Sequence, residues 1–162
     1  MLIKKQYSGF TIVELLIVIV VIGILAAITI VAFNGIQSRA NFAAYKSDID
    51  TLNKAVNLYY ADNGAYPGNL VGTNGCWTNT GTRNFISGLT PTYLPELPLT
   101  PNASAGNYYA YCFRAGGTEY KLIRLVNGGM TLPTVESTNN PDIDPIRSDR
   151  GWGVWSSDGS AL

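Results

Sequence analysis

One long apolar run near the N-terminus constrains this chain more than any other feature. From Phe10 to Phe33, 20 of 24 residues are apolar. A helix of roughly 20 apolar residues can span a bilayer, and a helix satisfies its own backbone hydrogen bonds in lipid. Lys4 and Lys5 precede the run, so the positive-inside rule places the N-terminus in the cytoplasm. The run therefore predicts one membrane-spanning helix with the C-terminal region outside.

Glu14 is the one charged residue inside this run. Asp, Lys or Arg at the bilayer centre costs about 2.5–3.5 kcal/mol on insertion scales, and intramembrane ionisable residues usually have a partner and a function. No basic residue lies between Lys5 and Arg39, so the helix offers Glu14 no obvious partner. Cleavage between Gly9 and Phe10 would create an α-amine about one helical turn from Glu14. Between staggered parallel helices, the amine of one chain could meet the carboxylate of another.

Two simpler hypotheses compete for the same segment. A cleaved secretory signal would use Lys4 and Lys5 as its basic region and be cut near Ala26-Ala27. Its apolar region would be long for a signal and would contain a carboxylate. A plain signal anchor, the second hypothesis, needs no role for Glu14.

The segment resembles the N-terminus of type IV pilins and their pseudopilin relatives, over about residues 4–36. A short basic leader of the class III type, residues 1–9, ends in Ser8-Gly9. The apolar run then opens with Phe10-Thr11-Ile12-Val13-Glu14-Leu15 and continues through Gly23-Ile24-Leu25-Ala26-Ala27-Ile28. Many pilins carry a proline where this chain has Val31, so we predict a continuous or only mildly disturbed helix there, with Asn34-Gly35 as its weakest point.

The resemblance implies a structural role without a cofactor. A membrane peptidase would cut after Gly9 and methylate the new amine of Phe10. Glu14, with Thr11 beside it, would guide docking into a growing filament, while apolar helices leave the bilayer to form its core. The implied partners are further copies of this chain in a helical homopolymer, the prepilin peptidase and N-methyltransferase, the assembly platform, its motor ATPase and, before assembly, the lipid bilayer.

The function expected from this resemblance is the repeating subunit of a surface type IV pilus. The exposed domain would give the filament its surface and is the part that could serve cell adhesion. A minor pilin or a secretion-system pseudopilin is the alternative within the superfamily. The alternative from another class is an uncleaved, monomeric, membrane-anchored extracellular binding module. The N-terminal residue of the mature protein separates these hypotheses.

Composition argues against enzyme chemistry. Histidine is absent, which removes the usual general base and the commonest metal ligand. Eleven basic residues balance eleven acidic residues, so there is no strong case for nucleic acid as a partner. The oxygen ligands of the acidic tail suit calcium, but their spacing matches no EF-hand pattern, so we expect a solvated loop in preference to a metal site. Its carboxylates belong to Asp142, Asp144, Asp149 and Asp158.

The helix is expected to continue beyond the membrane as an amphipathic segment. The division is a transmembrane and polymerisation helix over 10–33 and an amphipathic half over 34–63. Apolar residues recur there at steps of three and four, which predicts one buried stripe. Asp62-Asn63-Gly64 and Pro67 supply a stop. The stripe consists of Phe42, Tyr45, Ile49, Leu52, Val56 and Tyr59.

The remaining residues, 64–162, predict a globular head and hence an α+β fold: a long N-terminal helix packed on an antiparallel sheet of three to four strands. Residues 64–107 are rich in Gly, Thr, Asn and Pro and are expected to form a loop with a short helix near Asn84–Gly88. Residues 108–162 are expected to form the sheet and a C-terminal loop. The expected strands are Tyr108–Arg114, Glu119–Val126, Met130–Val135 at an edge marked by Pro133, and Trp152–Ser156.

Two further features of the head concern its side chains. Cys76 and Cys112 both lie on the exterior side, where an even pair favours a disulfide; two buried free thiols are the alternative. Trp77, Trp152 and Trp155 could build a surface platform for sugars, bases or cells, but packing in the core or between subunits is favoured.

Overall fold

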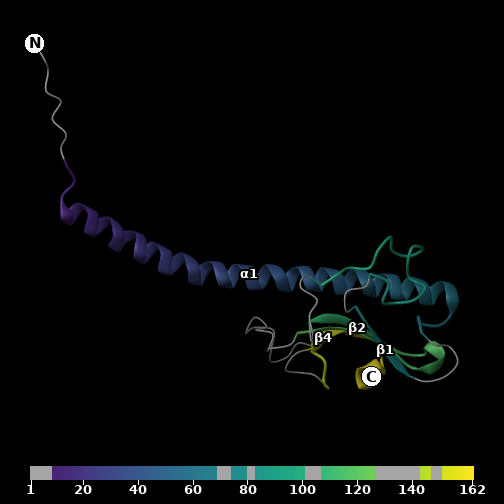
Figure 1. Cartoon of the computed structure of the whole chain (residues 1–162). Helices are drawn as coiled ribbons and strands as arrows, with labels where there is room; N and C mark the ends of the chain where they lie inside the picture. Colours follow the sequence, from purple (N-terminus) through teal and green to yellow (C-terminus); the bar gives the residue numbers. More distant parts are fainter. Residues whose placement is uncertain (1–8, 69–73, 80–82, 101–106, 127–142, 147–150) are drawn as a thin grey trace, which may run out of the picture. The chain divides into compact units, whose positions relative to one another are not determined.

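The computed structural model describes residues 9–68, 74–79, 83–100, 107–126, 143–146 and 151–162 (Figure 1). It contains one long helix and a four-stranded antiparallel sheet, so the predicted α+β fold is confirmed. The chain divides into two compact units, Met1–Ala40 and Asn41–Leu162. We refer to them as the N-terminal unit and the C-terminal unit and describe each by itself.

Helix α1 runs without interruption from Ile12 to Asn63. It passes through Val31 and Gly35 as regular helix, so the predicted continuity at Val31 is confirmed for the subunit. The helix ends where Gly64 takes a positive φ of 70°, a backbone conformation that glycine adopts without steric cost. The Gly64 N–H donates to the carbonyl of Tyr60 at 2.8 Å and completes the last turn.

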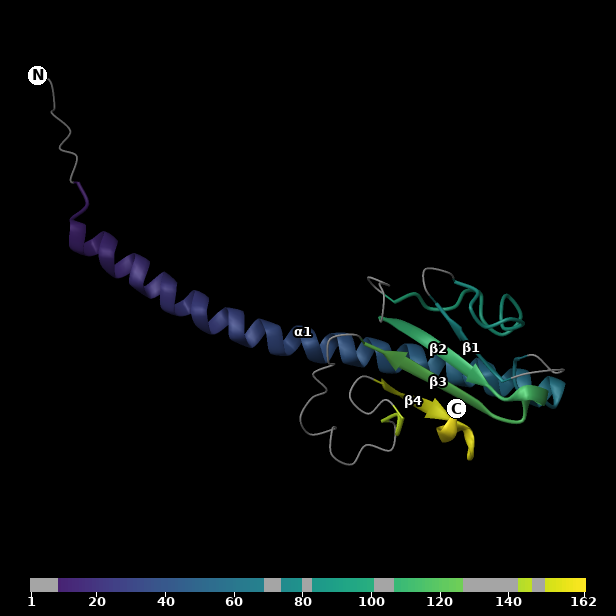
Figure 2. The same ribbon diagram turned by 60° about the horizontal axis from the view of Figure 1, so that its bottom comes forward.

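The sheet has the order β1-β2-β3-β4, with every neighbouring pair antiparallel (Figure 2). Its strands are β1 (Gly75–Thr78), β2 (Tyr108–Phe113), β3 (Tyr120–Leu125) and β4 (Gly151–Trp155). Short 3-10 helices cover Ala115–Gly117 and Gly159–Ala161. Three of the four expected strands have counterparts here, namely β2, β3 and β4. The fourth, Met130–Val135, lies outside the described residues.

Two expectations for residues 64–107 are wrong. Residues 75–78 form strand β1, which pairs with β2, although we expected loop there. Residues 84–88 form an irregular stretch that ends in a bend and a turn, instead of a short helix. Gly88 has a φ of 87°, which is incompatible with continuing a right-handed helix.

The inner face of the sheet packs on the C-terminal half of α1 around one apolar core. The predicted helical stripe is confirmed: Ile49, Leu52 and Val56 have no exposed surface, while Phe42, Tyr45 and Tyr59 pack at the margin of the same core. From the sheet, alternate residues of β2 point to this side, as the two-residue period of a strand requires. They are Tyr109, Tyr111 and Phe113.

Polar side chains also cross this helix–sheet interface. The Tyr109 hydroxyl donates to Asp48 of α1 at 2.5 Å, and the Tyr120 hydroxyl donates to Asn53 at 2.5 Å. Burial, followed by the hydrogen bond to Asp48, raises the pKa of Tyr109 well above its ordinary value. The guanidinium of Arg124 lies over the rings of Tyr109 and Tyr45, with centroid distances of 5.4 Å and 4.6 Å. Burial also raises the pKa of Tyr120, so Tyr109 and Tyr120 stay neutral and their hydrogen bonds align the helix on the sheet.

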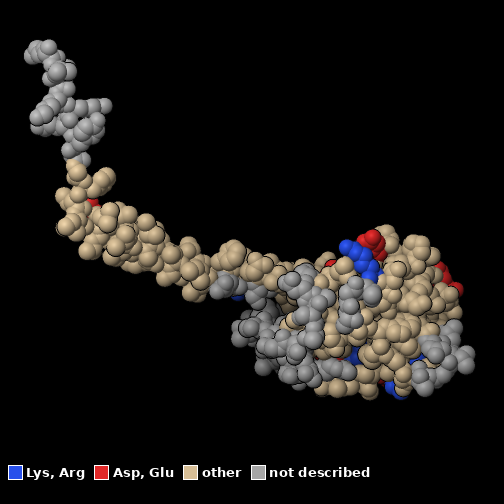
Figure 3. Space-filling model, in the orientation of Figure 1, with Lys and Arg blue, Asp and Glu red and all other residues tan. Residues whose placement is uncertain are grey.

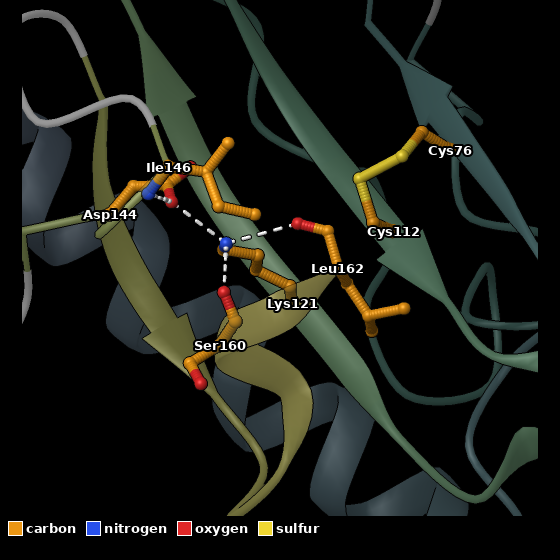
Figure 4. Close-up of polar contacts among 7 residues, drawn as sticks. All are labelled: Cys76, Cys112, Lys121, Asp144, Ile146, Ser160 and Leu162. Carbon is orange, nitrogen blue, oxygen red and sulfur yellow. Dashed lines mark hydrogen bonds and ion pairs between the residues drawn. A yellow bond between two sulfur atoms is a disulfide. The ribbon is translucent and has the colours of Figure 1, made fainter.

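The outer face of the sheet carries a row of residues in register across all four strands. Cys76 pairs with Cys112, Cys112 with Lys121, and Lys121 with Trp155. The sulfur atoms of Cys76 and Cys112 are bonded, which ties β1 to β2 (Figure 4).

Lys121 is the buried centre of this row. Its ammonium donates to Asp144 at 2.8 Å and to the carbonyl oxygens of Ser160 and Leu162 at 2.7 Å and 3.0 Å (Figure 4). Lys121 and Asp144 are both fully buried, so the expectation of a solvated loop is wrong for Asp144. The reason is that the ammonium supplies the counter-charge that burial of a carboxylate demands. Asp158 is exposed, whereas Asp142 and Asp149 lie outside the described residues.

Candidate functional site

The predicted cleavage junction lies just before helix α1. Gly9 and Phe10 are not helical and are exposed, and Phe10 is 88 % exposed. A peptidase needs an accessible backbone that is not held in a helix, and Gly9 and Phe10 meet this requirement. Gly9 has no other atoms near the position that a Cβ would occupy, so nothing in the subunit itself restricts this position to glycine.

Thr11 and Glu14 form a reciprocal cap on the first turn of the helix. The Glu14 carboxylate accepts two hydrogen bonds from Thr11, one from its backbone N–H and one from its hydroxyl, each at 2.8 Å. In return the Thr11 hydroxyl oxygen accepts from the Glu14 backbone N–H at 3.2 Å. This is a capping box, which satisfies backbone donors that the first turn of a helix leaves free.

The capping box corrects one expectation for Glu14. The sequence offers no basic partner, but the carboxylate has two donors within its own helix, both from Thr11. It also lies at the helix N-terminus, where the helix dipole favours negative charge. The signal was present in the sequence, because Thr11-Ile12-Val13-Glu14 has the spacing of a capping box. A count of charged residues does not reveal this partner, because the donor groups of Thr11 are neutral.

The rest of the N-terminal unit presents apolar side chains that remain exposed among its described residues. Every large aliphatic residue from Ile12 to Ile36 is about half exposed or more, from 48 % at Val21 to 85 % at Ile12. The face seen in Figure 3 is almost free of charged side chains over this stretch. Among the described residues, α1 is the one helix long and apolar enough to cross a membrane. A surface of this kind must be covered by lipid or by other protein chains.

Comparison with known proteins agrees with these features. The family model for the prokaryotic N-terminal methylation motif matches residues 4–30. The type II secretion system core protein G of Pseudomonas aeruginosa is 33% identical over 109 residues, which is 67% of this chain and 75% of the relative. The chain belongs to the type IV pilin and pseudopilin family. The corresponding protein of Vibrio cholerae is 32% identical over 110 residues, 66% of this chain and 71% of the relative.

A fimbrial relative also aligns with this type IV pilin-like subunit. Fimbrial protein EcpC of Eikenella corrodens is 27% identical over 158 residues, 82% of this chain and 99% of the relative. No solved structure matches the chain. Members of this family are structural, non-enzymatic proteins, and the prepilin-type apolar helix implies insertion in the inner membrane before assembly.

The structure separates the other residues that the sequence singled out in this pilin-like subunit. Trp152 is buried in the core against Phe42, with ring centroids 5.0 Å apart. Trp155 lies on the outer face, where the Lys121 ammonium is 5.6 Å from its ring centroid. Trp77 is half-buried at the opposite edge of the sheet. The three tryptophans therefore form no common platform. No group of three or more metal-ligating side chains gathers in the described part of the chain.

Proposed function

We propose that this protein is a secretion-system pseudopilin, cut after Gly9, methylated on Phe10 and assembled into a filament through its apolar helix. Two relatives that are at least 30% identical and aligned over more than two thirds of their own length are type II secretion core proteins. Of the alternatives that the sequence left open, this one has the stronger support.

The observation that carries the filament part of the proposal is the combination found at the start of α1; the choice of a pseudopilin rests on the relatives. A capped carboxylate, Glu14, lies one turn from an exposed Gly9-Phe10 junction, on a helix half whose apolar side chains are uncovered. In the membrane, lipid covers those side chains and Thr11 satisfies the carboxylate. In the filament, neighbouring helices take the place of lipid, and the α-amine of another subunit reaches Glu14. An ammonium–carboxylate bond is stronger than the neutral bonds from Thr11, which favours exchange of partners on assembly.

The partners follow from this cycle. A prepilin peptidase cuts and methylates the precursor at the cytoplasmic face of the membrane. An assembly platform and its motor ATPase then extract the subunit from the bilayer. The filament itself is a helical polymer of this chain, and its main cohesion comes from apolar burial.

A surface pilus subunit is the second candidate function. It is favoured by the fimbrial relative, whose alignment spans nearly the whole of that protein and most of this chain. The capping box and the apolar helix serve both kinds of filament equally. The choice between them therefore depends on where the filament is found and on what is lost without it.

Deletion of the gene tests the choice directly. If the protein is a pseudopilin, its deletion should leave surface filaments intact and abolish export of secreted proteins. If it is a pilus subunit, its deletion should abolish surface filaments and leave export intact. In both cases mass spectrometry of the wild-type protein should find methylated Phe10 at the N-terminus. An intact N-terminus at Met1 on a monomeric membrane protein would instead support the uncleaved binding module.

Processing is tested by a matched pair of glycine variants. Gly9→Leu should block cleavage, so that the membrane-bound product keeps the precursor mass. Gly23→Leu should be cleaved normally, because Gly23 lies within α1 with open space around it. Cleavage of Gly9→Leu at the wild-type rate would contradict the assigned junction.

A further inference from the structure

A groove of about 420 Å³ lies on the C-terminal unit, between β1, the turn at residues 86–88 and the end of α1. Its volume is within the range of small-molecule sites. We propose that this groove binds a neutral saccharide. The inference goes beyond the filament function and rests on residues that take no part in the Thr11–Glu14 cap.

Three glycines let the backbone pack directly against aromatic rings of the groove. A Cβ on Gly68 would lie 2.7 Å from the ring of Phe113, and a Cβ on Gly75 would lie 2.9 Å from the same ring. A Cβ on Gly88 would lie 2.9 Å from the ring of Tyr59. Each distance is shorter than a van der Waals contact, so a larger residue would displace the ring that it meets. The glycine backbone therefore covers Phe113, which is 3% exposed and forms the floor of the groove, while the ring of Tyr59 stays partly exposed.

Trp77 adds a third aromatic side chain to the lining. Its ring packs on Phe113 with a centroid distance of 4.5 Å and an interplanar angle of 50°, and part of it remains exposed. The disulfide between Cys76 and Cys112 joins β1 to β2, and Trp77 directly follows Cys76 on β1. The indole is thus held in place by a covalent tie, and its position does not depend on a mobile loop.

The polar groups of the groove are neutral. Asn74 is exposed, and its side-chain oxygen accepts a hydrogen bond from the Ala115 N–H at 2.9 Å, which fixes the amide and leaves its NH₂ group as a donor. Ser87 is exposed and offers a hydroxyl that both donates and accepts. None of the eight described lining residues carries a charge. This lining disfavours phosphates, carboxylates and metal ions as ligands.

Aromatic rings beside a neutral amide and a hydroxyl match the chemistry of a pyranose. The C–H face of such a sugar packs on aromatic rings, while its hydroxyls exchange hydrogen bonds with neutral donors and acceptors. A purely apolar ligand would leave Asn74 and Ser87 without partners. The lining therefore favours an uncharged sugar over both ionic and wholly apolar ligands.

The test uses the full chain in phosphocholine micelles, because maltoside detergents carry sugar head groups that would compete. Maltotriose, cellotriose and chitotriose are titrated while the three indole N–H signals are followed by NMR. The Trp77 signal should shift saturably with at least one sugar, and those of Trp152 and Trp155 should stay unchanged. Trigalacturonate, an anionic control, should produce no saturable shift.

Variants at two exposed serines complete the test. Ser87→Phe fills the groove and should remove the Trp77 shift, while Ser157→Phe, on another part of the surface, should keep it. The proposal is overturned if no neutral sugar shifts Trp77 saturably, if trigalacturonate acts equally, or if Ser87→Phe binds as well as wild type. Failure here leaves the filament function untouched, because that function is tested at Gly9 and Glu14.

Discussion

The two halves of helix α1 differ in how their apolar side chains are covered. In the N-terminal half, Ile24 is 57% exposed and its apolar neighbours are similar. In the C-terminal half, Ile49 and Leu52 have no exposed surface. One continuous helix thus carries one segment whose burial comes from its own chain and another whose burial must come from outside it. Stability of the C-terminal unit is an internal property, whereas the N-terminal unit acquires its apolar burial from lipid or from other subunits.

Matched isoleucine variants should show the largest difference between the two halves of α1. Ile49→Ala removes a fully buried side chain and should lower the free energy of unfolding of the C-terminal unit by about 2–5 kcal/mol. Ile24→Ala should change it by less than about 0.5 kcal/mol, as surface substitutions usually do. Denaturant unfolding of the full chain in micelles, followed by near-UV circular dichroism, measures both. Equal losses would show that the two halves are not independent.

The disulfide should give the next largest effect and confine it to the C-terminal unit. Replacing both Cys76 and Cys112 by serine frees the unfolded chain and should cost about 2–4 kcal/mol. Reducing agent should destabilise the wild type by a similar amount and leave the double variant unchanged. The same midpoint of unfolding for oxidised and reduced wild type would contradict this assignment.

Alkaline pH should unfold the C-terminal unit selectively, with a smaller and graded effect. Burial raises the pKa of Tyr109, Tyr111 and Tyr120 in the folded state, while tyrosines in the unfolded chain titrate near 10. The neutral form is favoured by folding, so this stabilisation is complete below pH 10 and is lost as the pH rises toward the raised folded values. The unfolding free energy, measured at increasing pH, should decline only above about pH 10. The described N-terminal unit contains no tyrosine, so the helical circular dichroism signal of this unit should persist. Loss of that helical signal in parallel with the unfolding of the C-terminal unit would argue against tyrosine ionisation as the cause.

The capping box should give the smallest effect, local to the first turn of α1. Thr11→Ala removes the hydroxyl from the cap and should destabilise this turn by about 0.5–2 kcal/mol. Hydrogen exchange should then speed up at the first amides of the helix. Thr29→Ala is the control, because the Thr29 hydroxyl donates only to helix carbonyls one turn back, at 2.9 Å and 3.0 Å. If exchange at the first amides became faster in Thr29→Ala and stayed unchanged in Thr11→Ala, Thr11 would not be the cap of the first turn.

Periodic features of the molecule could be predicted from the sequence, and features made by distant pairing could not. The helical stripe through Ile49 and Leu52 and the aromatic-rich run of β2 are local patterns, so they are visible without a structure. Strand β1 has only four residues in a stretch rich in Gly, Thr and Asn, and pairing with β2 more than 30 residues away defines it. The burial of Asp144 could not be predicted for the same reason, because its partner Lys121 lies 23 residues earlier in the chain.

At the candidate site, the residues were predicted but their bonding was not. Gly9, Phe10 and Glu14 stand out in the sequence because a carboxylate follows a glycine junction inside an apolar run. The hydrogen bonds between Thr11 and Glu14 depend on the local backbone at the helix start, which charge counting does not consider. The described lining of the neutral groove beside Trp77 comes from five separate segments of the C-terminal unit, so no local pattern indicates it.

Filament assembly by a Glu14→Ala variant tests the central claim most directly. Assembly is measured in cells that make no other pilin, together with the mass of the N-terminus, and Glu96→Ala serves as a control at an exposed carboxylate of the C-terminal unit. Our account predicts normal cleavage and membrane insertion of Glu14→Ala with a severe loss of filaments, and normal filaments from Glu96→Ala. Wild-type filament yield from Glu14→Ala would contradict the assembly role of the N-terminal carboxylate.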